Sequence, residues 1–194
     1  MTATGRELTW AEAVEHLASQ PFSVLLGARL VSFGAGRAVL EVDACRDLCQ
    51  QNGFLHGGVL AYATDNCLTY AAGTVAGPAV LTGAMTIDYL RPATGVTLRA
   101  TAHVVHAGRR RVLCSCDLEM VDDTGEARVV AVARGTVYPI LRSTAATPSE
   151  STTKVTRAQA GAAAWALSES MLCILRRWYQ RVYLANGVSA DFHQ

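Results

Sequence analysis

The chain has 194 residues, of which 51% are hydrophobic and 17% charged, and its formal net charge is +1. This balance excludes a disordered chain and gives no general basis for nucleic acid binding, so any recognition of an anion has to be local. The length suits one domain with an extension and allows a sizeable hydrophobic core.

The N-terminal segment and the cysteines indicate a cytoplasmic protein. The opening MTATGRELTWAEAVEHL is acidic and lacks the apolar core of a secretion signal. No run approaches about 20 uninterrupted apolar residues, so we do not expect a membrane span. The six cysteines lack the paired spacing of a metal site, and we expect them to be reduced thiols.

Three elements are expected in the first half of the chain. Leu8–Ser19 has helical spacing, with Leu8, Ala11, Val14 and Leu17 on one side, and Gln-Pro-Phe ends it. The strands Val24–Phe33 and Arg37–Asp43 are separated by Gly-Ala-Gly, which is typical of a hairpin. Leu55–Ala72 reads as a helix with apolar or small residues all round, which indicates burial on every side.

Four strands are expected in the second half. Ala79–Arg91 is the first, and period-two alternation marks the other three, at 96–104, 110–121 and 127–138. Turn residues between the last three favour antiparallel neighbours, so we expect the four to form a meander. An antiparallel sheet of this length needs one face covered, and the central helix is the only segment apolar enough to cover it. The expected fold class is therefore α+β, with the far side of the helix left for a partner chain.

The sequence changes character near Leu141. Residues 142–194 begin with a polar linker and continue as an amphipathic helical run, Arg157–Leu184, with three arginines beside its apolar stripe. We interpret this run as a helix that docks on a partner, and a helix on a membrane surface is the alternative. The expected organisation is an N-terminal helix (1–20), a central domain (21–141) and this tail.

A lone carboxylate, Asp65, lies inside the central helix, eight residues after Gly57. The first N–H groups of a helix lack partners, and glycine there lets a carbonyl approach closely enough to form an oxyanion hole. The two residues are roughly 12 Å apart along the axis, too far for one carbonyl to contact both in one chain. Antiparallel helices about 8–10 Å apart would bring Gly57 of one chain beside Asp65 of the other. Asp65 as a satisfied structural acid, with His-Gly-Gly as an ordinary helix start, is the alternative.

Three segments, NGFLHGGVLAYATDNCLTYAAG, TGAMTIDYLRP and GRRRVLCSCDLEMVDDTGE, resemble the hot-dog-fold thioesterases of the phenylacetate-degradation (PaaI-like) type. The resemblance implies a central helix wrapped by a five- or six-stranded antiparallel sheet. It also implies a homodimer with a continuous sheet, often paired into a homotetramer. The implied reaction is metal-free hydrolysis of acyl-CoA thioesters, with coenzyme A as part of the substrate and no further cofactor.

The same resemblance implies roles for five residues. Asp65 matches the catalytic carboxylate, which acts as general base on water or as nucleophile, and Gly57 matches the backbone oxyanion donor. His56 and Asn52 match the polar pair beside the thioester carbonyl and the water. Thr82 falls where the family often has a Ser or Thr that positions this water.

The phosphates of coenzyme A need cations, and four arginines are candidates. They are Arg91 at a strand end and the turn residues Arg109, Arg110 and Arg111. Arginine side chains suit phosphate oxygens through forked donors. The alternative is that these are solvated edge charges that discourage pairing between sheets.

Two further functions and a metal site are alternatives for this sequence. A non-catalytic acyl-CoA-binding or sensing module would not need a buried base, so Asp65 together with Asn52 and Gly57 favours the enzyme. A hot-dog dehydratase would be expected to carry Asp-x-Asn-Pro-x-His, which the sequence lacks. A zinc site is conceivable between two neighbouring strands, but no ligand spacing supports it; its residues would be His103, His106, Cys114 and Cys116.

Overall fold

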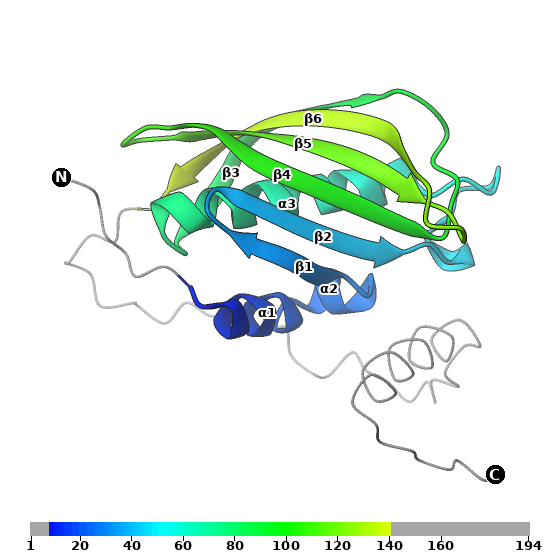
Figure 1. Cartoon of the computed structure of the whole chain (residues 1–194), viewed down its shortest axis with the longest axis horizontal. Coiled ribbons are helices and arrows are strands. Elements are labelled where there is room, and N and C mark those ends of the chain that lie inside the picture. Colours follow the sequence, from blue (N-terminus) through cyan, green and yellow to red (C-terminus); the bar gives the residue numbers. More distant parts are fainter. Residues whose placement is uncertain (1–7, 141–194) are drawn as a thin grey trace, which may run out of the picture. The chain divides into compact units, whose positions relative to one another are not determined.

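A computed structural model describes residues 8–140, which form one six-stranded antiparallel sheet packed against a long helix (Figure 1). This is the α+β hot-dog architecture that the sequence predicts. In chain order the elements are α1 (Trp10–Ala18), α2 (Pro21–Leu25), β1 (Arg29–Gly34), β2 (Arg37–Asp43), η1 (Arg46–Leu48), α3 (Gly57–Ala76), β3 (Val80–Tyr89), β4 (Thr97–Ala107), β5 (Val112–Val121) and β6 (Ala127–Pro139). The predicted linker and helix of the tail lie outside the described residues. Among residues 8–140, no helix is long and apolar enough to span a membrane.

The strand order corrects the predicted meander. The sheet runs β1-β2-β4-β5-β6-β3, so β3 pairs with β6 at one edge and β4 lies beside β2. The connection from β3 to β4 crosses the end of the sheet, where Leu90 N–H donates to the Val130 carbonyl and Val96 N–H to the Val121 carbonyl. Alternation along a strand reveals its faces but not its neighbours, and for this reason the meander prediction was wrong for β3.

Two corrections concern the N-terminal segment. The first predicted strand begins only at Arg29, because Pro21 starts the short helix α2 instead. Proline is favoured at the first position of a helix, where no N–H is needed. The apolar stripe predicted for α1 was also partly wrong, since Ala13 and Leu17 are buried whereas Val14 is exposed. The helix is therefore rotated, and His16 comes to lie against α3.

The central helix α3 is longer than predicted at its C-terminal end. It starts at Gly57, with His56 as N-cap, and continues through Gly73 to Ala76. The residue that ends it is Gly77, whose φ of 88° is a conformation that favours glycine. Gly73 is thus an interior helical residue, and its conformation gives no reason for glycine.

The core lies between α3 and the concave face of the sheet. Small inward side chains on the central strands, such as Ala38, Ala100 and Ala102, are fully buried and let the helix approach. The Cys67 thiol links helix and sheet, because its Sγ lies 3.3 Å from the carbonyls of both Ala38 and Ala100, which share its single S–H donor. Because this packing fixes the rotation of α3, it also fixes which helix residues remain outside the core.

Candidate active site

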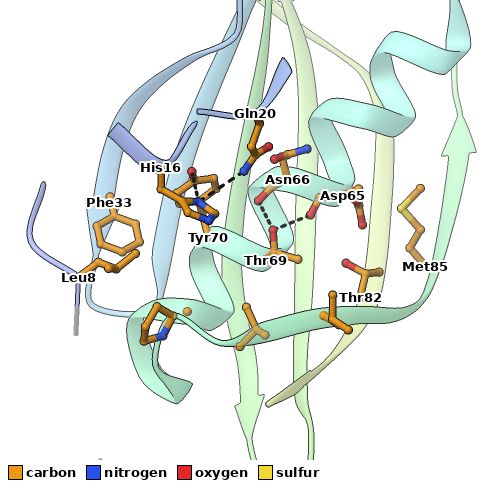
Figure 2. Close-up of a pocket in the computed structure, with 14 residues that line it drawn as sticks. Leu8, His16, Gln20, Phe33, Asp65, Asn66, Thr69, Tyr70, Thr82 and Met85 are labelled. Carbon is orange, nitrogen blue, oxygen red and sulfur yellow. Dashed lines mark hydrogen bonds between the residues drawn. The ribbon is translucent and has the colours of Figure 1, made fainter. Parts of the chain in front are cut away.

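A pocket of about 560 Å³ lies on the side of α3 that faces away from the core (Figure 2). Its walls come from four parts of the fold. α3 contributes Asp65 and Gly73, β3 contributes Thr82 and Met85, and α1 and β1 close the remaining sides. This volume falls within the range of small-molecule sites in proteins.

Asp65 and Thr82 point into the same space in this pocket (Figure 2). The Asp65 carboxylate is partly buried, yet it makes no hydrogen bond or ion pair with any of residues 8–140. The Thr82 Oγ1 is buried and also lacks a partner there. Buried polar groups are normally paired, so two unpaired groups together indicate a place for a water, a ligand or a second chain.

One face of α3 is only partly covered by the rest of residues 8–140. Gly58, Ala61, Asp65 and Thr69 follow one another at spacings of three and four residues, and none of them is classed as buried. Their side chains are small, apart from Asp65. A second helix can therefore approach this face closely. Ala72, which follows Thr69 at a spacing of three, does not extend this face, because it is fully buried in the core.

The start of α3 carries a free backbone donor. His56 is the N-cap, and its Nδ1 accepts a hydrogen bond from Gly58 N–H at 2.9 Å. The neutral ring therefore carries its proton on Nε2, which leaves Nε2–H free to donate. The Gly57 N–H has no acceptor among the described residues, while the Gly57 carbonyl accepts from the Tyr89 hydroxyl at 3.1 Å.

The predicted site residues thus fall into two groups within one chain. Asp65 and Thr82 share the pocket. Gly57 and His56 lie two turns away at the helix start, and Asn52 is exposed on the loop before it. At 1.5 Å per residue, Gly57 and Asp65 remain roughly 12 Å apart along the axis.

The four candidate arginines also fall into two groups, all of them exposed. Arg91 lies two residues after Tyr89, the last residue of β3, and the contact of Tyr89 with Gly57 places this end of the sheet at the start of α3. The turn from β4 to β5 holds the other three, Arg109, Arg110 and Arg111. It lies at the opposite end of the sheet, because Val112, just after the turn, pairs with Val137 of β6, which in turn pairs with Thr82 near the start of β3. None of the four pairs with a carboxylate of residues 8–140.

Sequence reasoning missed the contribution of α1 to the pocket. His16 and Gln20 line it, and the His16 ring lies 3.2 Å from the Tyr70 hydroxyl, which also donates to the Ala13 carbonyl. Burial and the nearby Tyr62 raise the pKa of Tyr70 to about 12, so its hydroxyl remains protonated at neutral pH. Rotating the apolar stripe of α1 by one residue would have directed His16 toward α3.

The histidines and cysteines considered for zinc do not converge. His103 is exposed on the outer face of the sheet, where its Nε2 lies 2.9 Å from Ser115 Oγ. Cys114 and Cys116 are fully buried on the opposite face, where burial raises the pKa of Cys114 to about 11. Among residues 8–140 no three His, Cys, Asp or Glu residues are grouped so that they could hold a metal ion.

Comparison with known proteins gives matches over the domain that holds these residues. Residues 52–132 match the model of the thioesterase superfamily. The chain is 31% identical over 132 residues to acyl-coenzyme A thioesterase PaaI of Escherichia coli. The matched region covers 68% of this chain and 91% of that protein.

Solved structures of similar fold extend these matches. A thioesterase family protein from Silicibacter pomeroyi has a TM-score of 0.63 and 32% identity, covering 67% of this chain and 97% of its own. The PaaI protein from the phenylacetic acid degradation operon of E. coli has a TM-score of 0.59 and 27% identity, covering 68% and 93% respectively. The matched family region, residues 52–132, contains Asn52, His56, Gly57, Asp65 and Thr82.

Proposed function

Because this chain belongs to the thioesterase superfamily and is a thioester hydrolase of the PaaI-like type, we propose that it cleaves acyl-CoA at a site shared between two chains. The products are a free carboxylic acid and coenzyme A. One chain contributes Asp65 and Thr82, and its partner contributes Gly57, His56 and Asn52.

The Asp65 carboxylate and the Thr82 hydroxyl, which share one pocket and have no partner among residues 8–140, carry this proposal. A water between the two groups would donate to the carboxylate and accept from the hydroxyl, which is the arrangement needed to attack a thioester carbon. A satisfied structural acid would instead have its own hydrogen-bond partners within the fold.

The start of the partner's α3 supplies the opposite half of the site. Its Gly57 N–H, which has no acceptor among residues 8–140, stabilises the oxyanion as negative charge develops on the thioester oxygen, and the helix dipole adds to this. His56 is held by its cap hydrogen bond so that Nε2–H is free to orient the carbonyl. The small residues Gly58, Ala61 and Thr69 support this pairing, since they permit antiparallel helices to approach.

An antiparallel pair would also unite the two groups of arginines. Arg91 lies at the N-terminal end of α3 and the turn from Arg109 to Arg111 at its C-terminal end. Pairing the helices antiparallel places Arg91 of one chain at the same end as this turn of the other. We assign the coenzyme A phosphates to this mixed cluster, whose guanidinium groups make no ion pair with a carboxylate of residues 8–140.

Release of free thiol from a panel of acyl-CoA thioesters tests the function. The purified protein should hydrolyse arylacetyl, aroyl or medium-chain acyl-CoA, and treatment with a chelator should leave the rate unchanged. Absence of hydrolysis across the panel would refute the activity, and loss of activity on chelation would refute the metal-free mechanism.

A further inference from the structure

Gly73 is a buried glycine in the C-terminal half of α3 that packing does not explain. Glycine in the interior of a helix is less stable than alanine, because it loses more conformational freedom on folding. Its φ is not among the positive values found in this chain, so the backbone does not require it. Apart from its chain neighbours and the backbone of its own helix, a Cβ added at Gly73 would meet no atom of the described residues within 4 Å.

Other glycines of the fold differ in this respect. A Cβ at Gly135 would lie 2.6 Å from Leu68 Cδ1, and one at Gly83 would overlap the Tyr138 ring. Those two positions need glycine because a neighbour occupies the space. At Gly73 the space is empty although the residue is buried, so glycine there keeps a space open.

The open space at Gly73 belongs to the pocket that contains Asp65. Both residues line it, and Thr69 lies between them on the same side of α3. Gly73 is eight residues beyond Asp65, roughly 12 Å along the helix axis. The lining of this pocket includes several apolar and aromatic side chains, among them Phe33, Tyr70, Pro78 and Val80.

We propose that Gly73 forms the end of the acyl-binding part of the pocket and sets the length of acyl group that the enzyme accepts. This rests on the proposed function, because Asp65 marks the position of the thioester. An extended polypeptide advances about 3.3–3.6 Å for every three backbone bonds, and an extended acyl chain has a similar zigzag. A span of about 12 Å therefore accommodates roughly ten bonds of the acyl chain. The preferred substrate class is therefore an apolar acyl group of about ten carbons, straight or ending in a ring.

Two substitutions, Gly73→Ala and Gly73→Leu, shorten this space by different amounts. A straight-chain acyl-CoA series from two to twelve carbons is assayed by thiol release. Each methylene that loses its place in an apolar pocket lowers kcat/KM about 4-fold. Gly73→Ala takes the place of one methylene and should therefore reduce kcat/KM for decanoyl-CoA about 4-fold. Gly73→Leu extends three carbons into the space and should reduce it about 60-fold. For butyryl-CoA, kcat/KM should change less than about 3-fold in both variants.

Val75→Leu is the matched control, because it enlarges a side chain on the same helix that is exposed and does not line the pocket. It should leave the chain-length profile unchanged. Gly73→Ala should also raise the melting temperature, since it replaces glycine in a helix without a clash. An unchanged profile in both Gly73 variants would overturn the proposal. A uniform loss at every chain length, or an altered oligomeric state by light scattering, would overturn it as well.

Binding without turnover separates this proposal from the proposed function. In an Asp65→Asn background, acyl-CoA should raise the melting temperature by an amount that grows with chain length up to about ten carbons, since tighter ligands stabilise the folded state more. Adding Gly73→Leu should remove the gain from the longer chains. If the wild-type protein hydrolyses nothing but shows this dependence, the hydrolase function fails and the acyl-binding role of Gly73 stands. If hydrolysis occurs but the melting temperature does not depend on chain length, the hydrolase function stands and the acyl-binding role of Gly73 fails.

Discussion

At the scale of single residues, the role of Asp65 can be tested by removing its charge and keeping its shape. Asp65→Asn keeps the volume of the side chain but can neither accept a proton from water nor attack a carbonyl. We expect kcat to fall about 10²–10⁴-fold, as is typical when a positioned base is lost. Because the carboxylate has no hydrogen bond within residues 8–140, we expect the melting temperature to stay close to that of the wild type.

Thiol release and thermal denaturation of the same preparation measure both quantities. Asp123→Asn, on an exposed turn, is the matched control and should change neither. Breaking a buried ion pair typically costs about 3–5 kcal/mol. Near wild-type turnover with a clearly lowered melting temperature would therefore identify Asp65 as a structural acid and refute the mechanism.

Thr82 gives a second prediction, in which activity falls while stability stays nearly unchanged. Thr82→Val removes a buried hydroxyl that lacks a partner and keeps the shape of the side chain. Because no group of residues 8–140 pairs with this hydroxyl, its removal should change the free energy of unfolding by less than about 1 kcal/mol. Loss of the water-positioning group should lower kcat at least about 10-fold.

Urea denaturation and steady-state kinetics of Thr82→Val measure the two effects, and Thr82→Ser should restore activity because it keeps the hydroxyl. A valine variant that is less stable and fully active would mean that the hydroxyl has a structural partner instead.

At the scale of elements, the start of α3 allows one N–H group to be deleted with little change to the fold. Gly57 is the first residue of the helix, where proline is favoured, and His56 has the extended conformation (φ −65°, ψ 135°) that a residue before proline prefers. A Cβ at Gly57 would lie 3.4 Å from the Tyr89 hydroxyl oxygen, an acceptable contact. Gly57→Pro should therefore fold and lower kcat about 10²–10³-fold, the cost of one lost oxyanion donor.

Circular dichroism and kinetics with one acyl-CoA check this outcome. Gly57→Ala is the control, because it introduces a Cβ but retains the N–H. If the proline variant folds and matches the alanine variant in kcat, the Gly57 N–H has no role in stabilising the oxyanion.

The sequence predicts elements better than it predicts their neighbours. Alternation in β4, β5 and β6 marks their inward faces, and the turn residues between them correctly indicate antiparallel pairing. Nothing local marks β3 as the partner of β6, because the seven-residue connection 90–96 decides where β4 lies. For the site, the spacing of Gly57 and Asp65 could be read directly, whereas the pocket depends on how α1 is rotated against α3. That rotation is a property of packing, which sequence periodicity determines only to within about one residue.

At the scale of the whole molecule, a shared site predicts complementation between two inactive variants. Gly57→Pro leaves Asp65 intact, and Asp65→Asn leaves the helix start intact. A mixed dimer would contain one fully intact site and one site with both defects. Random mixing of equal amounts makes half of the dimers mixed, so activity should return to about a quarter of the wild-type value.

The measurement is the rate after the two proteins are mixed and allowed to exchange subunits, with each protein alone as the control. Mass spectrometry under native conditions would establish that mixed dimers are present. Mixed dimers without recovered activity, or an active monomer by light scattering, would refute a site shared between chains.

The placement of Gly73 on the same helix as Asp65, two turns away, has a consequence for how such an enzyme can evolve. Glycine to alanine requires a single nucleotide change, and at this position the change is expected to stabilise the helix by up to about 1 kcal/mol. A lineage could therefore acquire a preference for shorter substrates without passing through a less stable intermediate or altering the catalytic groups. Selection that keeps glycine at this position would in turn be evidence that long substrates matter to the cell.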